Sequence, residues 1–516
     1  MKWFLPLLSG LLLSLSLERP YFWWVVLLAQ IPFFVFLEIT GNQNKNTRRE
    51  VFLGGWLLGF VFFSLTFRFI LYSFPGGWAG VHNTLSAAPL FAIAWLGTSL
   101  FVSLPFGLFG LLSLKFLKIF PFITLPSLWI LSEYFRAVLF GVFAWGPGAT
   151  LGPHWTFGDL GYVFIDTPIV FWSRLVGLYG LSFLVVCINF FLFRIFKKEF
   201  RLIFPVTLFL LFLFYAPNLF FQEGPQEKPL NIALVHTEKL LGSLSQDDFS
   251  SLWEKAITKE KGFQQPDVVI FPEGGTLFSD DSNKTLLENI FSKKDTDGLI
   301  ITSSVVSYES GTKERMIYRT QNNEILSVQD KTFLIPGGEY LPVILKAFLY
   351  FQDKTLLERF SSSRTRIPGD VLEMPVPFGD TKIGALMCSG IVSPSLYRSL
   401  ANKGAEILVN SASQIVFRNE PFFLRQIKTM ARFQAVSTAR PFLQASNGGQ
   451  SFFIDSRGDV IKESSSFEDQ ILFVQVSPSE TKTPYTRFGD WPVIISLSVL
   501  VFSIFRTRKF RSSDPK

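Results

Sequence analysis

Long apolar runs fill the first part of the chain and give way to a mixed pattern of apolar and polar residues near position 222. A helix needs about 20 mostly apolar residues to cross a bilayer. Seven runs before residue 222, and one more near the C-terminal end, approach this length, so the pattern predicts a polytopic α-helical membrane protein with about eight transmembrane helices. The predicted helices span 3–17, 21–39, 51–73, 85–113, 119–140, 166–195, 202–221 and 490–505.

Lys and Arg residues alternate from loop to loop along these helices. The loops 74–84 and 141–165 contain neither residue, whereas the loops between helices two and three, four and five, and six and seven are basic, as is the C-terminal tail. Cytoplasmic loops are enriched in Lys and Arg, so we expect a cytoplasmic N-terminus and an exoplasmic segment 222–489. The basic residues are Lys45, Arg48, Arg49, Lys115, Lys118, Arg194, Lys197, Lys198, Arg201, Arg506, Arg508, Lys509, Arg511 and Lys516.

The composition supports a membrane location and narrows the chemistry. Charged residues make up 17% of the chain, against roughly 25% in soluble proteins. The net charge of +7 comes from the basic loops, so nucleic-acid binding is not expected. The three His residues, His82, His154 and His236, are far apart in sequence, and no phosphate-binding Gly loop is present. We therefore expect neither a metal nor a cofactor.

The segment 222–489 has a different pattern, in which short apolar runs of strand length alternate with polar, helix-like stretches. This alternation predicts an α/β domain whose sheets are covered on their faces. We divide the chain into a membrane domain at 1–221, an inserted α/β domain at 222–489, and a final helix with a basic tail at 490–516. The predicted strands are 231–235, 267–271, 298–302, 382–387, 405–409, 451–454 and 470–475.

Candidate chemistry lies next to these predicted strands, where α/β proteins often place their active sites. Glu273 follows one strand directly, Cys388 follows another, and Lys331 opens a Gly- and Pro-rich stretch between them. A thiol needs a base to become a good nucleophile, and an ammonium can stabilise the oxyanion that its attack creates. The three residues together predict cysteine-based acyl or amide chemistry.

The order Glu, Lys, Cys resembles that of the nitrilase superfamily, whose fold is an α-β-β-α sandwich. With the membrane helices, the whole chain resembles the bacterial apolipoprotein N-acyltransferase family. Three segments carry most of the resemblance: Phe271-Pro272-Glu273, Lys331-Thr332-Phe333-Leu334-Ile335-Pro336-Gly337-Gly338-Glu339-Tyr340-Leu341-Pro342, and Gly384-Ala385-Leu386-Met387-Cys388.

The resemblance implies a reaction and a place. A phospholipid, usually phosphatidylethanolamine, donates an acyl chain to Cys388 as a thioester, and the N-terminal amine of a diacylated apolipoprotein then accepts it. Glu273 would be the general base, Lys331 would stabilise the oxyanion, Glu339 would orient the Lys or shuttle protons, and the Ser389 N–H would be a further oxyanion donor. We expect a monomer in the bilayer of the bacterial inner membrane, with its catalytic domain in the periplasm.

Several positions depart from the family pattern, among them the stretch 410–417 and the loop 236–248, which lacks an expected Trp. Ser389 and Gly390 replace a common Tyr-Glu pair, and Ser437 replaces a Glu before Arg440-Pro441. Two alternatives therefore stay beside the acyltransferase. One is a membrane-tethered nitrilase-type hydrolase, which would pass the acyl or amide carbon to water. The other is a diverged paralogue that binds lipid or lipoprotein without acylating it.

Apolar residues flank the catalytic segments and predict lipid access. The run 343–351 includes Phe348 and Tyr350, and a second region includes Phe417 and Phe422. Such residues can belong to a core, but exposed apolar surface beside a site often marks a membrane or ligand contact. We expect both regions to form arms that admit lipid.

Two features of the membrane half are open to more than one interpretation. The loop 141–165, rich in Gly, Pro and Trp, is either an interfacial turn or part of a substrate mouth. Glu133 and Arg136 stand three residues apart in a predicted helix, a spacing that allows an ion pair. Pairing is favoured over a transport function, because ionisable residues inside membranes are costly and this pair is a thin basis for a transporter.

Overall fold

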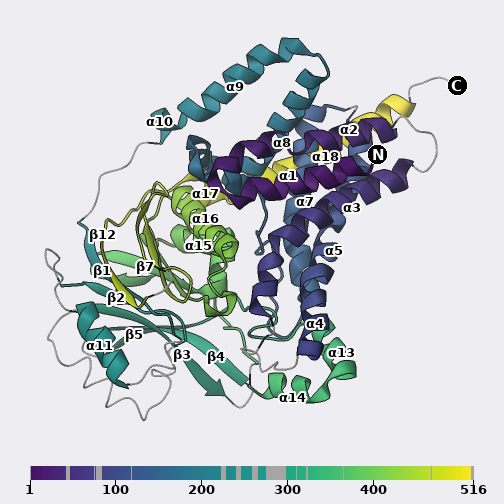
Figure 1. Cartoon of the computed structure of the whole chain (residues 1–516). Helices are drawn as coiled ribbons and strands as arrows, with labels where there is room; N and C mark the ends of the chain where they lie inside the picture. The colour runs from purple at the N-terminus through teal and green to yellow at the C-terminus, as the bar shows by residue number, and fades with distance from the viewer. Residues whose placement is uncertain are drawn as a thin grey trace.

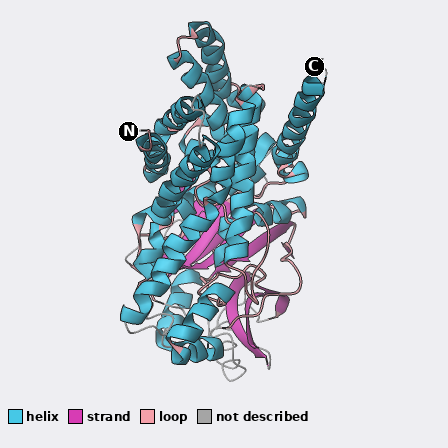
Figure 2. Ribbon diagram, turned by 90° about the vertical axis from the view of Figure 1, so that its right-hand side faces the viewer, coloured by secondary structure: helices cyan, strands magenta, loops and turns pink. Residues whose placement is uncertain are grey.

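The structure joins a helical half to a half built on two β-sheets (Figures 1 and 2). It is a computed structural model of the chain. It describes residues 2–41, 47–74, 76, 84–117, 119–221, 228–239, 246–257, 265–274, 298–308, 311–320, 324–363, 365–465 and 468–512. The predicted basic-loop residues Lys45, Lys118 and Lys516 lie outside these ranges.

The helical half is confirmed in part. Within the described ranges, five helical segments are long and apolar enough to cross a membrane: Pro20–Gly41, Thr47–Thr66, Ala87–Phe116, Pro121–Phe143 and Pro168–Phe196. The other three predicted spans form shorter apolar helices, so the count of about eight is not confirmed. The helices are α1 (Phe4–Glu18), α2 (Ile31–Gly41), α3 (Thr47–Thr66), α4 (Thr84–Ala92), α5 (Thr98–Val102), α6 (Leu104–Phe116), α7 (Pro121–Phe143), α8 (Ser173–Phe196), α9 (Ile203–Tyr215), α10 (Pro217–Phe220) and α18 (Trp491–Ser512).

The predicted pair between Glu133 and Arg136 on α7 is wrong. Arg136 instead bonds Asp159, with 2.6 Å between the guanidinium and carboxylate and both side chains fully buried. Glu133 accepts from the Trp129 indole and from the backbone N–H of Leu160. The chain after α7 folds back into the bundle and supplies Asp159 and the Leu160 N–H. A spacing rule within one helix therefore could not find these two partners.

The second half is a four-layer sandwich, as expected from the nitrilase resemblance. Apolar side chains from both sheets form the core between them. One sheet, sheet A, has the order β12-β1-β2-β3-β4-β5, and the other, sheet B, has β11-β10-β9-β8-β7-β6. The strands are β1 (Leu230–His236), β2 (Val268–Ile270), β3 (Leu299–Tyr308), β4 (Gly311–Thr320), β5 (Ile325–Asp330), β6 (Val376–Phe378), β7 (Thr381–Met387), β8 (Ile407–Ser413), β9 (Phe442–Asn447), β10 (Phe452–Ile454), β11 (Val460–Glu463) and β12 (Gln470–Val476).

Each of the seven predicted strands has a counterpart, but five strands were not predicted. β1, β2 and β3 run parallel, as do β7, β8 and β9, and these central strands are buried and apolar. The unpredicted β4 carries Lys313, Glu314 and Arg315 in a row. It forms because it pairs with β3 and β5 in a meander, and not because of an apolar pattern.

The outer helices of the sandwich have different surroundings. Helix α11 (Gln246–Ile257) packs on the outer face of sheet A. Helices α15 (Pro394–Asn402) and α16 (Pro421–Thr438) cover sheet B, and their apolar residues form one continuous core with the membrane helices. The α16 residue Arg432 bonds Asp166 of the membrane half at 2.5 Å. Sheet B is therefore fixed to the helical half through its helix layer.

A helical hairpin links the two halves at another place. Helices α13 (Val343–Gln352) and α14 (Lys354–Ser363) follow the Lys331 segment and lie beside α4 (Figure 1). Leu349, Leu356 and Ala87 form a small apolar cluster between them. The hairpin, which we call the arm, thus extends from the sheet domain to a membrane helix.

Candidate active site

Three strand ends bring the predicted residues into one site. Glu273 lies just beyond β2, Lys331 directly follows β5, and Cys388 directly follows β7. The backbone N–H of Glu273 donates to the carbonyl of Ala412 in β8, which joins sheet A to sheet B at this edge. The charges of Glu273 and Lys331 both act on the Cys388 thiol. All three residues therefore belong to one site.

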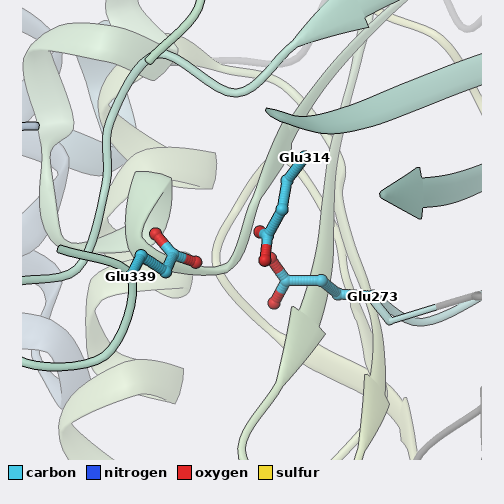
Figure 3. A group of neighbouring side chains, drawn as sticks. All are labelled: Glu273, Glu314 and Glu339. Carbon is cyan, nitrogen blue, oxygen red and sulfur yellow. The ribbon is translucent and has the colours of Figure 1, made fainter. Parts of the chain in front are cut away.

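A buried ammonium stands at the centre of three carboxylates. Lys331 is 1% exposed, and its Nζ lies 2.8 Å from Glu273 and 3.2 Å from Glu314, and also bonds Glu339. Figure 3 shows the three carboxylates turned toward one space, and one oxygen from each lies within 4.8 Å of the others. Such oxygens would suit a hard cation, but the Lys331 ammonium already contacts all three.

Glu314 is the member of this group that the sequence did not reveal. It lies in β4 and points at Lys331, whose backbone N–H donates to its carbonyl at 2.8 Å. Its other carboxylate oxygen accepts from Arg366 at 3.2 Å. Neighbouring charged residues on both sides make Glu314 look like part of a solvated surface, so no sequence signal distinguished it.

Burial and neighbouring charges divide the carboxylates. Burial raises the pKa of Glu273 to about 7, although Lys331 opposes the shift. Burial also tends to raise the pKa of Glu314, but the positive charges of Lys331 and Arg366 outweigh it and lower the pKa to about 2. Burial and the negative charge of Glu314 raise the pKa of Glu339 well above the usual range. Near neutral pH, Glu314 is thus the ionised partner of Lys331, while Glu273 can gain or lose a proton.

Cys388 occupies a strained turn. Its φ of 40° lies in the left-handed region, which costs a non-Gly residue about 1–3 kcal/mol and is frequent at functional sites. The side chain is half-buried, and its Sγ lies 3.7 Å from the Ser413 carbonyl. Burial and the charge of Glu273 raise the pKa of the thiol well above its ordinary value, although Lys331 lowers it. The resting group is a thiol that needs a base.

Asn447 connects the two sheets behind the site. Its amide donates to the Glu273 carbonyl at 2.5 Å and its side-chain oxygen accepts from Ser413 at 2.6 Å. Ser413 in turn offers its carbonyl to the Cys388 thiol. No role was predicted for Asn447 from the sequence.

Two of the departures from the family pattern, Ser389 and Gly390, have local structural explanations. Ser389 donates from its hydroxyl to the Phe333 carbonyl, which ties the Cys388 turn to the Lys331 segment. A Cβ at Gly390 would come within 2.8 Å of the Leu386 Cβ, so this form of the turn favours Gly. The buried Ser437 side chain donates to the Gln434 carbonyl at 3.4 Å, and nothing in the structure explains why Ser stands there. Ser389 and Gly390 are thus compatible with the conformation of the Cys388 turn.

The loop 141–165 of the membrane half contacts both the Lys331 segment and the Cys388 turn. The Ala144 carbonyl accepts from the Tyr340 hydroxyl at 2.9 Å, next to Glu339. Thr156 donates to the Val392 carbonyl at 2.8 Å, at the end of the Cys388 turn. These contacts make the loop a support for the site; whether it also forms a substrate mouth stays a prediction.

The four predicted lipid-access residues have different surroundings. Tyr350 is 52% exposed on the arm and Phe348 is half-buried there. Phe422 is buried beneath the Arg68 guanidinium, and Phe417 packs on Phe423. Both residues therefore help to pack α16 and the segment before it against the membrane helices. Exposure therefore supports an access role for the arm more than for Phe417 and Phe422.

Comparison with known proteins matches two family models to two parts of the chain. A model described as the apolipoprotein N-acyltransferase N-terminal domain matches residues 9–191, and a carbon-nitrogen hydrolase model matches residues 232–484. The apolipoprotein N-acyltransferase of Geobacter metallireducens is 27% identical and covers 75% of this chain and 74% of its own length. That of Haemophilus influenzae is 23% identical and covers 96% and 92%.

Among solved structures, a carbon-nitrogen hydrolase of Helicobacter pylori is 16% identical, with a TM-score of 0.38, and covers 52% of this chain and 94% of its own. The two family models together span most of the sequence, and relatives of one name match both halves. This chain belongs to the apolipoprotein N-acyltransferase family, the membrane-bound branch of the nitrilase superfamily.

Proposed function

We propose that this protein transfers a fatty acyl chain from a membrane phospholipid, through a thioester on Cys388, to the N-terminal amine of diacylated apolipoproteins. The observation that carries the proposal is the set of Cys388, Glu273 and Lys331 in a domain packed against membrane helices. The names of the relatives point to lipoprotein N-acylation. Membrane helices beside the site would give it access to a lipid donor.

The first half-reaction follows from the protonation states. The Cys388 sulfur attacks the ester carbonyl of the phospholipid while the thiol proton passes to Glu273, whose pKa of about 7 lets it accept the proton and return it. Lys331 stabilises the negative oxygen of the tetrahedral intermediate, with the Ser389 N–H as a second donor. The carbon–oxygen bond then breaks, and the lyso-phospholipid leaves with the proton from Glu273.

The second half-reaction reverses these roles. The lipoprotein amine attacks the thioester carbonyl and gives its proton to Glu273. The carbon–sulfur bond breaks, an amide forms, and the Cys388 sulfur takes the proton back. Glu339, bonded to Lys331 and to the backbone N–H of Ile335, keeps the ammonium in place through both steps.

We place the reaction at the periplasmic face of the bacterial inner membrane, with a monomer acting on phosphatidylethanolamine. The sequence supports this placement, because the loops predicted to be cytoplasmic carry the Lys and Arg residues and the site lies in the segment predicted to be exoplasmic. The chain divides accordingly into the membrane domain 1–221, the catalytic domain 222–489 and the final helix with its tail, 490–516.

The test is intact mass spectrometry of the purified protein in micelles that contain phosphatidylethanolamine, with Cys388→Ala as the control. We expect a mass gain of one acyl chain, absent from the control and discharged by a diacylated lipopeptide. A thioester that only water discharges would replace the proposal with a hydrolase, and an absence of adduct would replace it with a non-catalytic paralogue.

A further inference from the structure

An ion pair outside the predicted triad is built into the same site. Arg366 follows the arm, and its Nε bonds Glu314 at 3.2 Å while its Nη1 bonds the Thr312 hydroxyl at 2.6 Å. The Arg366 backbone N–H also donates to the Glu339 carbonyl at 2.7 Å. Arg366 therefore contacts two of the three glutamates around Lys331.

The backbone fixes this pair to Lys331 as well. The Lys331 N–H donates to the Glu314 carbonyl at 2.8 Å, and the Lys331 carbonyl accepts from Gly369 at 2.9 Å. Both the backbone and the side chain of Glu314 contact Lys331, so β4 and the Lys331 segment are joined at this point.

We propose that Glu314, held by Arg366, is a positioning residue for the acyl transfer: it keeps the Lys331 ammonium beside Glu273 and, by its own negative charge, strengthens the hold of Glu273 on the proton received from Cys388. This inference rests on the proposed function. It assigns to β4 a part in the chemistry beyond the Glu, Lys and Cys residues.

The charges around Glu273 give the direction of the effect. Lys331, Glu314, Glu339 and the Cys388 thiol face its carboxylate. Glu373 lies behind Lys331, where its carboxylate accepts from the backbone and hydroxyl of Thr332. Glu314 is the ionised carboxylate of this group, and like charges this close disfavour a second ionisation. Removing the charge of Glu314 should let Glu273 ionise at lower pH.

The experiment measures the pH dependence of Cys388 alkylation by iodoacetamide in the full-length protein in micelles, with the modified peptide quantified by mass spectrometry. Glu314→Gln keeps the shape and removes the charge, Glu314→Asp keeps the charge, and Asp330→Asn is the matched control. Asp330 is the partner of the neighbouring Arg315 across the same two strands. Alkylation needs no lipid, so it remains measurable even if the acyl transfer itself is refuted.

We expect the midpoint of the alkylation profile to move down by about one to two pH units in Glu314→Gln, and to stay in place in Glu314→Asp and Asp330→Asn. A Glu314→Gln profile that superimposes on that of the unaltered protein overturns the proposal. If Glu314→Gln does not fold, Arg366→Gln tests the same charge: loss of the guanidinium should move the midpoint to higher pH, and an unmoved midpoint refutes the inference.

Discussion

The Lys331 ammonium lies 2.8 Å from the Glu273 carboxylate, and both side chains are buried. A buried charge is costly unless it is paired and hydrogen-bonded. Here the Lys331 ammonium bonds three carboxylates, so the protonation states of the carboxylates depend on one another. The pH at which each carboxylate ionises then decides when the site can accept a proton.

The first prediction concerns the pH dependence of thioester formation. Glu273 must be ionised to take the thiol proton, and its pKa is raised from 4.5 to about 7. The rate should therefore rise with pH through about 7 and be low below pH 6. Rapid-quench sampling followed by intact mass spectrometry would measure it. Glu273→Gln should be slow at every pH, and a rate that already levels off near pH 5 would exclude Glu273 as the base.

The second prediction concerns the buried cation. Lys331→Met leaves the carboxylates without their partner, so thioester formation should fall about 100-fold or more. The free energy of unfolding should drop by about 3 kcal/mol at pH 8. The drop should be smaller at pH 5, because protonated carboxyls need no cation.

Thermal melts followed by Trp fluorescence at the two pH values would measure this change in stability. Lys313→Met is a suitable control, because Lys313 forms more exposed ion pairs with Asp330 and Asp370, and such pairs contribute at most about 1 kcal/mol. Equal destabilisation of Lys331→Met at both pH values would contradict the charge argument.

The membrane helices and the buried strands could be predicted because their signals are local. An apolar run of about 20 residues has few structural meanings, and the strands that end at Glu273 and Cys388 are continuous apolar segments. β4 could not be predicted in this way. It carries Lys313, Glu314 and Arg315 in a row, and it is a strand because β3 and β5 hydrogen-bond to it. Glu314 lies in β4, so its place in the site could not be predicted from the sequence for the same reason.

Contacts between segments that are far apart in the chain could not be predicted from the sequence either. Arg136 pairs with Asp159 and not with the nearer Glu133, because the intervening loop returns into the bundle. The bond from Asn447 to the Glu273 carbonyl likewise depends on how the two sheets meet. Glu273, Lys331 and Cys388 could be proposed from the sequence because they adjoin recognisable motifs, whereas the groups that bond them come from distant segments.

The third prediction concerns the membrane loop that supports the Cys388 turn. Thr156→Val removes the buried hydroxyl that bonds the Val392 carbonyl at 2.8 Å, so stability should fall by about 1–2 kcal/mol. Thioester formation should slow several-fold because the turn loses an anchor. Thr150→Val in the same loop is the matched control, since that hydroxyl lies 3.5 Å from the Thr332 carbonyl, at the limit of a hydrogen bond. Equal rates in both variants would argue against a support role.

The last prediction concerns the arm. Tyr350 and Phe351 are 52% and 86% exposed, beside an apolar contact between the arm and α4. Exposed aromatic residues near a membrane favour contact with lipid, so Tyr350→Asp should weaken turnover of phospholipid in vesicles by several-fold or more. A soluble short-chain ester reaches Cys388 without crossing this surface, so its turnover should be unchanged.

Phe348→Asp should act in the same direction with an added cost in stability, because that ring is half-buried. Gln352→Asp provides the control, since it adds the same charge at an exposed polar position of the same helix. Turnover of vesicle phospholipid and of soluble ester would be measured side by side for each variant. If Tyr350→Asp reduces both activities equally, the residue supports the site itself and does not admit lipid, because a loss confined to lipid entry cannot slow a substrate that arrives from water.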